Sequence, residues 1–176
     1  AELGPPNEEL RYAAARSAAM FRNPAALEVV DGFTRSGGAR AEEAADLLVR
    51  ALEPAAATVR VQRLARSTDG IRPAIRGAMA LGDPTLVPWL LDCAESEDHA
   101  RLASWAVTTL MGRDLVEMGS RVAPPPNHQQ GPSDRPEDAD VSMDPDESLE
   151  WPDAVRLKRA WERERGRFQR GRRYLL

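Results

Sequence analysis

The sequence predicts an all-α protein made of short, repeated α-helical hairpins. Three observations predict this fold class. The chain of 176 residues is 42% hydrophobic but only 5% aromatic, and alanine supplies much of the apolar content. Small, helix-favouring residues allow helices to approach one another closely. A break marked by proline recurs at a constant spacing, and apolar residues around it follow the helical period.

The break consists of a polar residue followed by proline, and it occurs every 30 residues. Proline at the first turn of a helix leaves no useful donor unsatisfied, and Asn or Asp just before it acts as an N-cap. Each break therefore predicts the start of the second helix of a hairpin. The three copies are Asn23-Pro24, Glu53-Pro54 and Asp83-Pro84.

The flanks of the breaks repeat as well. At a displacement of 60 residues, Arg16 matches Arg76, Ala18 matches Ala78, and Phe21 matches Leu81. The spacing i, i+3, i+4, i+7 predicts an amphipathic helix from Ile71, followed by a partner helix from Pro84. A further helix over 99–111 has similar spacing and is predicted to be half of a fourth unit. The apolar positions of these three helices are Ile71, Ala74, Ile75 and Ala78; Leu86, Val87, Leu90, Leu91 and Ala94; and Leu102, Ala103, Ala106, Val107 and Leu110.

These hairpins are most like HEAT repeats, although 30 residues is short against the roughly 40–47 of standard HEAT or armadillo units. The Thr-Pro-Leu-His turn of ankyrin repeats and the Trp, Leu-Gly and Tyr pattern of tetratricopeptide repeats are not found. We predict a HEAT-like array over residues 1–118, with three units and a partial fourth, that forms an α-solenoid with an extended binding surface.

Residues 119–176 are predicted to form an irregular acidic loop and a basic C-terminal helix that cap the array. Prolines forbid a long helix before residue 150, whereas a helix is predicted over 153–165. Aromatic residues favour packing against the last repeat over disorder, and we expect the acidic loop to fold back near the basic helix. The aromatic residues are Trp151, Trp161, Phe168 and Tyr174; the nine basic residues begin at Arg156 and end at Arg173.

Motifs from Gly82 onward resemble a bacterial family of HEAT-like-repeat proteins. These motifs are Gly82-Asp83-Pro84, Val87-Pro88-Trp89-Leu90-Leu91, Gly131-Pro132-Ser133-Asp134, Val141-Ser142-Met143-Asp144-Pro145-Asp146 and Trp151-Pro152-Asp153, with Trp161, Phe168, Gly171 and Arg173-Tyr174-Leu175 at the end. Members of that family are often encoded in type VI secretion gene clusters and have no assigned biochemical activity. Full-length members are longer, so the resemblance implies that this chain, which begins at Ala1, is a C-terminal portion.

Composition limits the classes of partner. The formal net charge of −4 argues against a surface built entirely for polyanions. The single cysteine, Cys93, excludes an internal disulfide and a cysteine-based zinc cage. The sequence has no signal-like start and no apolar stretch of membrane-spanning length. We therefore predict a cytoplasmic protein without a membrane partner.

A calcium loop is a weaker alternative for the acidic segment. Oxygen-bearing residues alternate there as in the first nine positions of an EF-hand loop. The glycine of the sharp turn is replaced by Met143, and the bidentate glutamate by Leu149. The simpler interpretation of these alternating acids is a solvated loop that binds no ion. The candidate ligands are Asp138, Asp140, Ser142, Asp144 and Asp146.

Catalysis has no support in the sequence. His99 and His128 are isolated and lack the following glutamate of iron-binding HEAT-like proteins. Cys93 lies on the apolar side of the helix from Pro84, where a lone cysteine usually serves as a small hydrophobe. There is no nucleophile elbow, P-loop or dinucleotide-binding glycine pattern. We predict a protein that is not an enzyme and needs no cofactor.

Two binding hypotheses remain. The first is a scaffold that binds another protein through a groove around Trp89 and Trp105. The alternative is a nucleic-acid or phosphate binder that uses an arginine strip. Against the strip, the same arginines can be solvated and paired with Glu42, Glu43 and Asp46. The strip consists of Arg60, Arg63, Arg66, Arg72 and Arg76.

Overall fold

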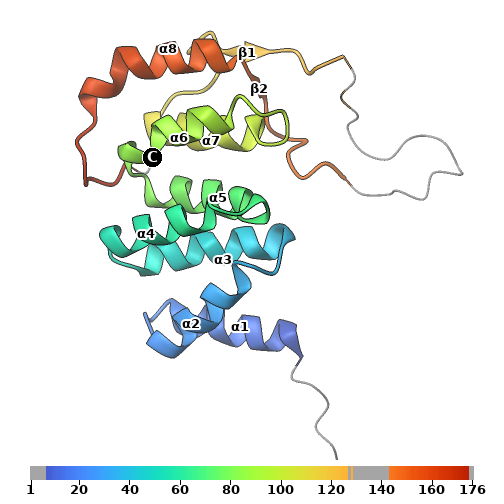
Figure 1. The fold of residues 1–176 in the computed structure, drawn as a ribbon, viewed down its shortest axis with the longest axis vertical. Coiled ribbons are helices and arrows are strands. Elements are labelled where there is room, and N and C mark those ends of the chain that lie inside the picture. Colours follow the sequence, from blue (N-terminus) through green and yellow to red (C-terminus); the bar gives the residue numbers. More distant parts are fainter. Residues whose placement is uncertain (1–6, 127, 129–142, 175–176) are drawn as a thin grey trace, which may run out of the picture.

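The computed structural model describes residues 7–126, 128 and 143–174, and this part of the chain is all-α (Figure 1). Eight α-helices account for most of it, and one antiparallel pair of two-residue strands is the only sheet in the described part. None of the described helices is long and apolar enough to cross a membrane. The helices are α1 (Glu8–Ala19), α2 (Pro24–Phe33), α3 (Gly38–Ala51), α4 (Pro54–Leu64), α5 (Ile71–Leu81), α6 (Val87–Cys93), α7 (Ala100–Met111) and α8 (Ala154–Glu164); the strands are β1 (Arg121–Val122) and β2 (Trp151–Pro152).

The predicted helix starts are confirmed at Pro24 and Pro54 and only in part at Pro84. Helices α2 and α4 begin at Pro24 and Pro54, and a 3₁₀ turn, Pro84–Leu86, leads into α6. The side chain of Asn23 accepts a hydrogen bond from the amide of Ala26 at 3.1 Å, as an N-cap does. The second helix of the third unit is therefore a 3₁₀ turn followed by a short α-helix, rather than one helix from Pro84.

Helices that are close in sequence are also packed together. Helix α1 packs on α2, α2 on α3, and α3 on both α4 and α5; α5 then packs on α7, and α7 on α6. The contact between α3 and α5 is the most extensive in the described part of the chain. Figure 1 shows the helices in successive layers, with α1 and α2 at one end and α8 at the other.

Two apolar clusters hold these layers together. The smaller cluster joins α1, α2 and α3 around Tyr12, Val30 and Leu48. The larger cluster runs from α3 to α8 and has Ile75 and Leu157, both fully buried, among its members. Burial of apolar surface is the main stabilising contribution, at about 25 cal/mol per Å², so both clusters contribute to the stability of the chain.

The contact between α3 and α5 depends on a glycine within a helix. A Cβ atom on Gly77 would lie 3.2 Å from a methyl carbon of Val61 and 3.3 Å from one of Val49. Glycine is unfavourable in a helix interior by about 1 kcal/mol relative to alanine. Its presence here allows α5 to approach α3 and α4 closely.

The C-terminal segment returns to the helices. Leu157, Ala160 and Trp161 of α8 are buried in the larger cluster, and Phe168 and Tyr174 pack against it as predicted. The amide of Tyr174 donates a hydrogen bond of 2.8 Å to the carbonyl of Gly82. Gly82 has φ of 64°, and a Cβ there would lie 2.2 Å from the carbonyl oxygen of Tyr174. Only glycine fits this position.

The acidic loop was expected to fold back near the basic helix, but two of its described acids, Asp144 and Asp146, pair elsewhere, whereas Asp153 pairs with Arg156 of α8. Asp144 and Asp146 pair instead with Arg101 of α7 and Arg72 of α5. Basic residues of the C-terminal segment pair with nearby acids, such as Arg165 with Glu162. Asp144 and Asp146 pair with residues far away in the sequence because the two arginines are partly or fully buried and must have their charge compensated.

Candidate functional site

The predicted arginine strip is largely engaged in ion pairs within the chain. Arg60 and Arg63 extend from α4 to Asp31 of α2, with N–O distances of 2.8 and 2.9 Å. Arg35 adds a third guanidinium group at 3.6 Å, so Asp31 lies among three arginines, and only 16% of its side chain is exposed. Arg60 and Arg63 are both hydrogen-bonded to Asp31, but one carboxylate cannot neutralise three guanidinium groups, so the cluster keeps a net positive charge.

Arg72 and Arg76 are engaged by Glu42 of α3. Arg72 Nε donates a 2.8 Å hydrogen bond to Glu42 Oε1, and Arg76 Nε lies 3.8 Å from Glu42 Oε2. Glu42 was an expected partner of the strip, but Glu43 and Asp46 pair instead with Arg16 and Arg50. Of the five strip residues, Arg66 is exposed and has no ion pair with a described residue.

Arg72 also makes the most specific contact of this region. Its two terminal nitrogens donate to the two carboxylate oxygens of Asp146, at 2.9 and 2.8 Å. Such bidentate pairs are among the strongest hydrogen bonds in proteins. The bonds to Asp146, together with those to Glu42, raise the pKa of Arg72 despite its burial. The two partners are 74 positions apart in the sequence, so this pair places a loop acid against α5.

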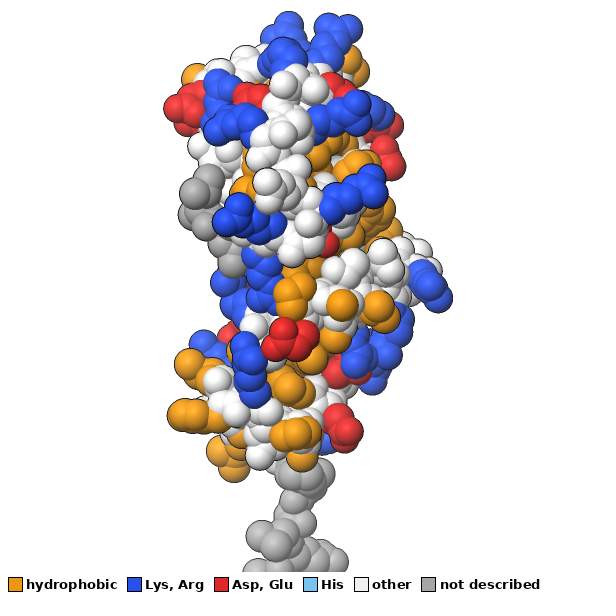
Figure 2. All heavy atoms as spheres, turned by 90° about the vertical axis from the view of Figure 1, so that its left-hand side faces the viewer, with side chains coloured by type: hydrophobic (Ala, Val, Ile, Leu, Met, Phe, Trp, Pro, Cys, Tyr) orange, Lys and Arg blue, Asp and Glu red, His pale blue; other side chains and the backbone are white. Residues whose placement is uncertain are grey.

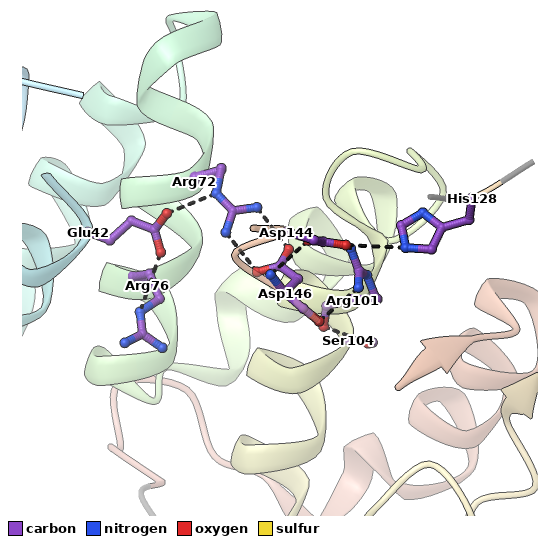
Figure 3. A network of polar contacts seen from close by, with 8 residues as sticks. All are labelled: Glu42, Arg72, Arg76, Arg101, Ser104, His128, Asp144 and Asp146. Carbon is purple, nitrogen blue, oxygen red and sulfur yellow. Dashed lines mark hydrogen bonds and ion pairs between the residues drawn. The ribbon is translucent and has the colours of Figure 1, made fainter. Parts of the chain in front are cut away.

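Arg101 extends this network into α7 (Figure 3). It is 6% exposed, donates to the backbone carbonyl of Asp146 at 2.8 Å, and forms an ion pair with Asp144. Its guanidinium lies 4.6 Å from the centroid of the Trp151 ring. His128 approaches the same carboxylate, with Nε2 3.2 Å from Asp144 Oδ2, and its ring packs edge-on against Trp151.

The pKa of Asp144 is lower than its ordinary value. Burial acts to raise it, but hydrogen bonds from Arg101 and from the amide of Asp146 lower it by more. Asp144 is thus an anion fixed by a buried arginine. The network joins α3, α5 and α7 to the segment 143–150, so its first role is to fasten that segment to the helices.

The calcium alternative can be compared with the structure at two of its five residues. Asp144 and Asp146 direct their carboxylates toward Arg101 and Arg72 rather than toward a common centre. Asp138, Asp140 and Ser142 lie outside the described residues. Within the part that is described, no group of three or more His, Cys, Asp or Glu residues could hold a metal ion.

The two tryptophans proposed for a groove lie in different settings. Trp89 of α6 is half-buried and packs against the larger apolar cluster. Trp105 of α7 is 39% exposed, and the guanidinium of Arg76 lies 5.0 Å from its ring centroid. Trp105 borders an open depression of about 160 Å³, which Trp89 does not line; the depression is formed by Arg101, Ser104, Trp105, Thr108, Asp114, Leu115, Ser148, Leu149 and Glu150.

Cys93 occupies the apolar setting that its helical position predicts. It packs against the larger cluster, and burial, with a smaller effect from Asp92, raises the pKa of its thiol to about 11. The thiolate is the nucleophilic form of cysteine. At neutral pH this side chain is therefore a thiol that packs, not an activated nucleophile.

The sequence did not predict Arg101 and Trp151 as members of this network, nor Asp31 as the partner of Arg60 and Arg63. Arg101 carried a detectable signal, because it stands in a helix whose apolar residues point in nearly all directions. A charged residue in such a helix must find a buried partner. The partner itself, 43 residues later in an irregular loop, carried no local signal.

No protein-family model, curated protein or solved structure matches the chain. The resemblance to a family of HEAT-like-repeat proteins stays a prediction.

Proposed function

We propose that this chain is a non-enzymatic interaction module that binds another protein through the surface around Trp105 and Arg76. We further propose that α1 to α7 form short HEAT-like hairpin repeats of an α-solenoid. The contacts between successive hairpins and the prolines at intervals of 30 residues support this organisation. In such arrays an extended surface serves for binding.

The observation that carries the proposal is the exposed tryptophan beneath an arginine. Residues that dominate binding energy at protein interfaces are enriched in Trp, Tyr and Arg, and they lie near well-packed pockets. Trp105 and Arg76 provide both residue types, and the depression beside Trp105 offers a pocket with the apolar side chains of Leu115 and Leu149.

Contacts within the chain restrict the site before any partner binds, although Arg76 Nε, 3.8 Å from Glu42, makes no hydrogen bond with a described residue. Arg76 lies between Trp105 and Glu42, and Glu42 is fixed in turn by Arg72. The pocket wall formed by Leu149 belongs to the segment that Asp144 and Asp146 fasten to α5 and α7. A rigid site loses little conformational entropy on binding, which favours affinity.

Affinity capture from the native host tests the proposal. The bait proteins are the wild type, Trp105→Ala and, as a control, Val59→Ala, which shortens another exposed apolar side chain that lies on α4. We expect one protein to be enriched by the wild type and the control, and lost with Trp105→Ala. Equal recovery with all three baits, or no enrichment with any, would contradict the proposal.

The resemblance to proteins encoded in type VI secretion gene clusters suggests a cellular context. We propose a cytoplasmic accessory or scaffold role in such an assembly. The genes beside the one that encodes this chain test this part directly. A neighbourhood without secretion components would remove the context but would leave the binding surface to be tested on its own.

Binding of nucleic acid or phosphate remains the second proposal. It has less support, because Arg60, Arg63 and Arg72 are already paired with carboxylates of the chain. If it held, binding to DNA or RNA would weaken steeply with salt, and the double variant Arg60→Glu, Arg63→Glu would lose it. A flat titration at low salt would eliminate it.

A further inference from the structure

The C-terminal end of the molecule carries a basic surface that the proposed function does not use. Residues 154–174 contain nine arginines and lysines and two acids, a net charge of +7, whereas the whole chain has −4. Both acids, Glu162 and Glu164, already pair with arginines of the chain. Five other cations are exposed and make no ion pair with a described residue. We call them the C-terminal basic surface: Lys158, Arg159, Arg163, Arg170 and Arg172.

Packing determines which side of α8 faces the solvent. Leu157, Ala160 and Trp161 are buried in the larger cluster. The helical period of 3.6 residues therefore directs Arg159 and Arg163 outward. These two arginines are four residues apart, and like charges at that spacing repel each other and disfavour the helix. A bound anion would relieve this repulsion. Figure 2 shows Lys and Arg side chains at the end of the molecule that α8 forms.

A pocket adjoins this surface at the C-terminal end of α8, and Arg170 belongs to both. The pocket is open to solvent and has a volume of about 270 Å³. Pockets that enclose a whole drug-sized ligand have volumes of roughly 300–1,000 Å³, so this one suits a single ring system. No acid is among its described lining residues. We call it the C-terminal pocket; it is lined mainly by Pro84, Pro88, Trp161, Arg165, Phe168 and Arg170.

The lining combines flat apolar surfaces with cations. The proline and aromatic rings offer flat faces to a planar group, and the guanidinium groups of Arg165 and Arg170 offer forked donors to an anion beside it. The aromatic wall is held by the chain itself. Phe168 lies 5.2 Å from Trp161 and 5.0 Å from Tyr174, measured between ring centroids. The pocket is therefore suited to a planar ring that carries a neighbouring negative charge.

We infer that this end of the chain binds single-stranded nucleic acid, with one base in the C-terminal pocket and neighbouring phosphates on the C-terminal basic surface. Proteins that bind single strands combine a positively charged track with aromatic side chains that contact the bases. Both features occur here side by side. Eight of the nine cations are arginines, whose planar guanidinium groups match phosphate oxygens in pairs. Single-stranded DNA and RNA share this chemistry.

Other polyanions fit these observations less well. A helix that binds an anionic membrane inserts its apolar face, but the apolar face of α8 is buried against the larger cluster. Duplex nucleic acid keeps its bases stacked and paired, so none can enter a pocket. An acidic protein can pair with the cations, but it does not carry a flat ring beside each charge as every nucleotide does.

The inferred binding goes beyond the function proposed above and does not depend on it. The C-terminal pocket is formed by α8, the residues after it and the turn before α6, whereas Trp105 is on α7. Arg170→Glu should leave protein capture through Trp105 intact, and Trp105→Ala should leave nucleic-acid binding intact. The surface also differs from the arginine strip, whose Arg60 and Arg63 are on α4.

Fluorescence anisotropy with labelled oligothymidine and oligouridine at low salt tests the inference. We expect binding whose log–log salt slope is about −2.8 if four phosphates are contacted. Arg170→Glu should weaken binding by about tenfold and reduce the slope by about 0.7, because one contact is lost. The matched control Arg66→Glu makes the same charge change at an exposed arginine after α4 and should bind like the wild type.

The outcomes of this experiment separate the alternatives. Binding of only one of the two oligomers would identify the source of the strand. Absence of binding to both, or an equal loss with Arg170→Glu and Arg66→Glu, would overturn the inference. The double variant Arg60→Glu, Arg63→Glu should bind like the wild type; loss of binding in that variant alone would assign the site to the arginine strip instead.

An abasic oligomer with the same number of phosphates tests the role of the pocket. We expect it to bind at least about fivefold more weakly than oligothymidine, because the contact between a base and the aromatic wall is lost. Equal affinities would contradict a base in the C-terminal pocket. Polyglutamate at the same charge concentration should not displace oligothymidine. Displacement would show that the surface serves an acidic protein and would overturn the inference.

Discussion

At the scale of single residues, the buried arginine Arg101 accounts for the position of the loop acid Asp144. Arg101 is nearly inaccessible and is compensated by a carboxylate, a backbone carbonyl and the face of Trp151. A buried charge without a partner is costly, whereas a fully paired one is tolerated. Asp144 and Asp146 of the loop therefore pair with the buried arginines and not with the basic C-terminal helix.

The variant Arg101→Ala should lower the free energy of unfolding by about 3–5 kcal/mol, because it leaves Asp144 with an uncompensated charge. Chemical denaturation followed by circular dichroism measures this. The control Arg66→Ala removes an exposed arginine without an ion pair among the described residues and should change stability by less than about 0.5 kcal/mol. Similar values for the two variants would show that the network is not stabilising.

Stability should fall in acid through Asp144. Folding lowers the pKa of this carboxyl below its ordinary value of 3.8. Its contribution is therefore complete above that pH and is lost as the pH falls through the lower pKa of the folded state. The acid limb of a stability–pH curve should be flatter for Asp144→Asn than for the wild type. Glu97→Gln, an exposed residue in the turn before α7, should leave the slope unchanged.

Cys93 should react slowly with thiol reagents in the native state. Burial raises the pKa of the thiol to about 11, so little thiolate is present at pH 7–8. The rate of labelling by a chromogenic disulfide should be far lower in the folded protein than in denaturant. Equal rates would contradict the packing of Cys93 against the larger cluster.

At the scale of elements, the sequence predicted the helices better than their contacts. Local features were sufficient to predict where helical turns begin and which face of α7 is buried, because helix starts and faces are local properties. These features are the prolines at positions 24, 54 and 84 and the apolar spacing of α7. The long-range ion pairs could not be predicted, because they depend on how the hairpins are placed relative to one another. These pairs join Arg60 and Arg63 to Asp31, and Arg72 to Asp146. Glu42 was among the expected partners only because acids cluster in α3.

The approach of α3 and α5 should be sensitive to the size of residue 77. Gly77→Leu should destabilise the protein by about 1–3 kcal/mol, since overpacking forces neighbouring side chains and backbone to move. Gly32→Leu is a matched control, because nothing lies within 4 Å of a Cβ built at Gly32 in α2. Thermal unfolding of both variants measures the difference. Equal melting temperatures would show that α3 and α5 are not closely packed in solution.

At the scale of the whole molecule, the C-terminal residues contact the ends of two helices, α3 and α5. Arg173 donates a 2.9 Å hydrogen bond to the carbonyl of Leu52, at the end of α3, and Tyr174 bonds to Gly82 after α5. Together with Trp161 and Phe168, whose tilted rings have centroids 5.2 Å apart, they hold α8 against the helices. The sequence predicted this packing from the aromatic residues but not the backbone contacts.

Gly82→Ala should weaken that attachment, since the new Cβ would collide with the carbonyl of Tyr174. We expect a lower melting temperature and a red-shifted tryptophan emission as Trp161 becomes exposed. Gly119→Ala is the control, because Gly119 has the same left-handed backbone with φ of 63° but no atom within 4 Å of the added carbon. Equal effects would assign the loss to backbone strain alone.

We propose that the exposed Trp105, covered by Arg76, contacts a protein partner. The most direct measurement is the dissociation constant of the captured protein for the wild type, Trp105→Ala and Val59→Ala, by isothermal titration calorimetry. We expect Trp105→Ala to weaken binding by about 30-fold, which corresponds to a hot-spot loss of about 2 kcal/mol, and Val59→Ala to bind like the wild type. An unchanged dissociation constant for Trp105→Ala would contradict the claim.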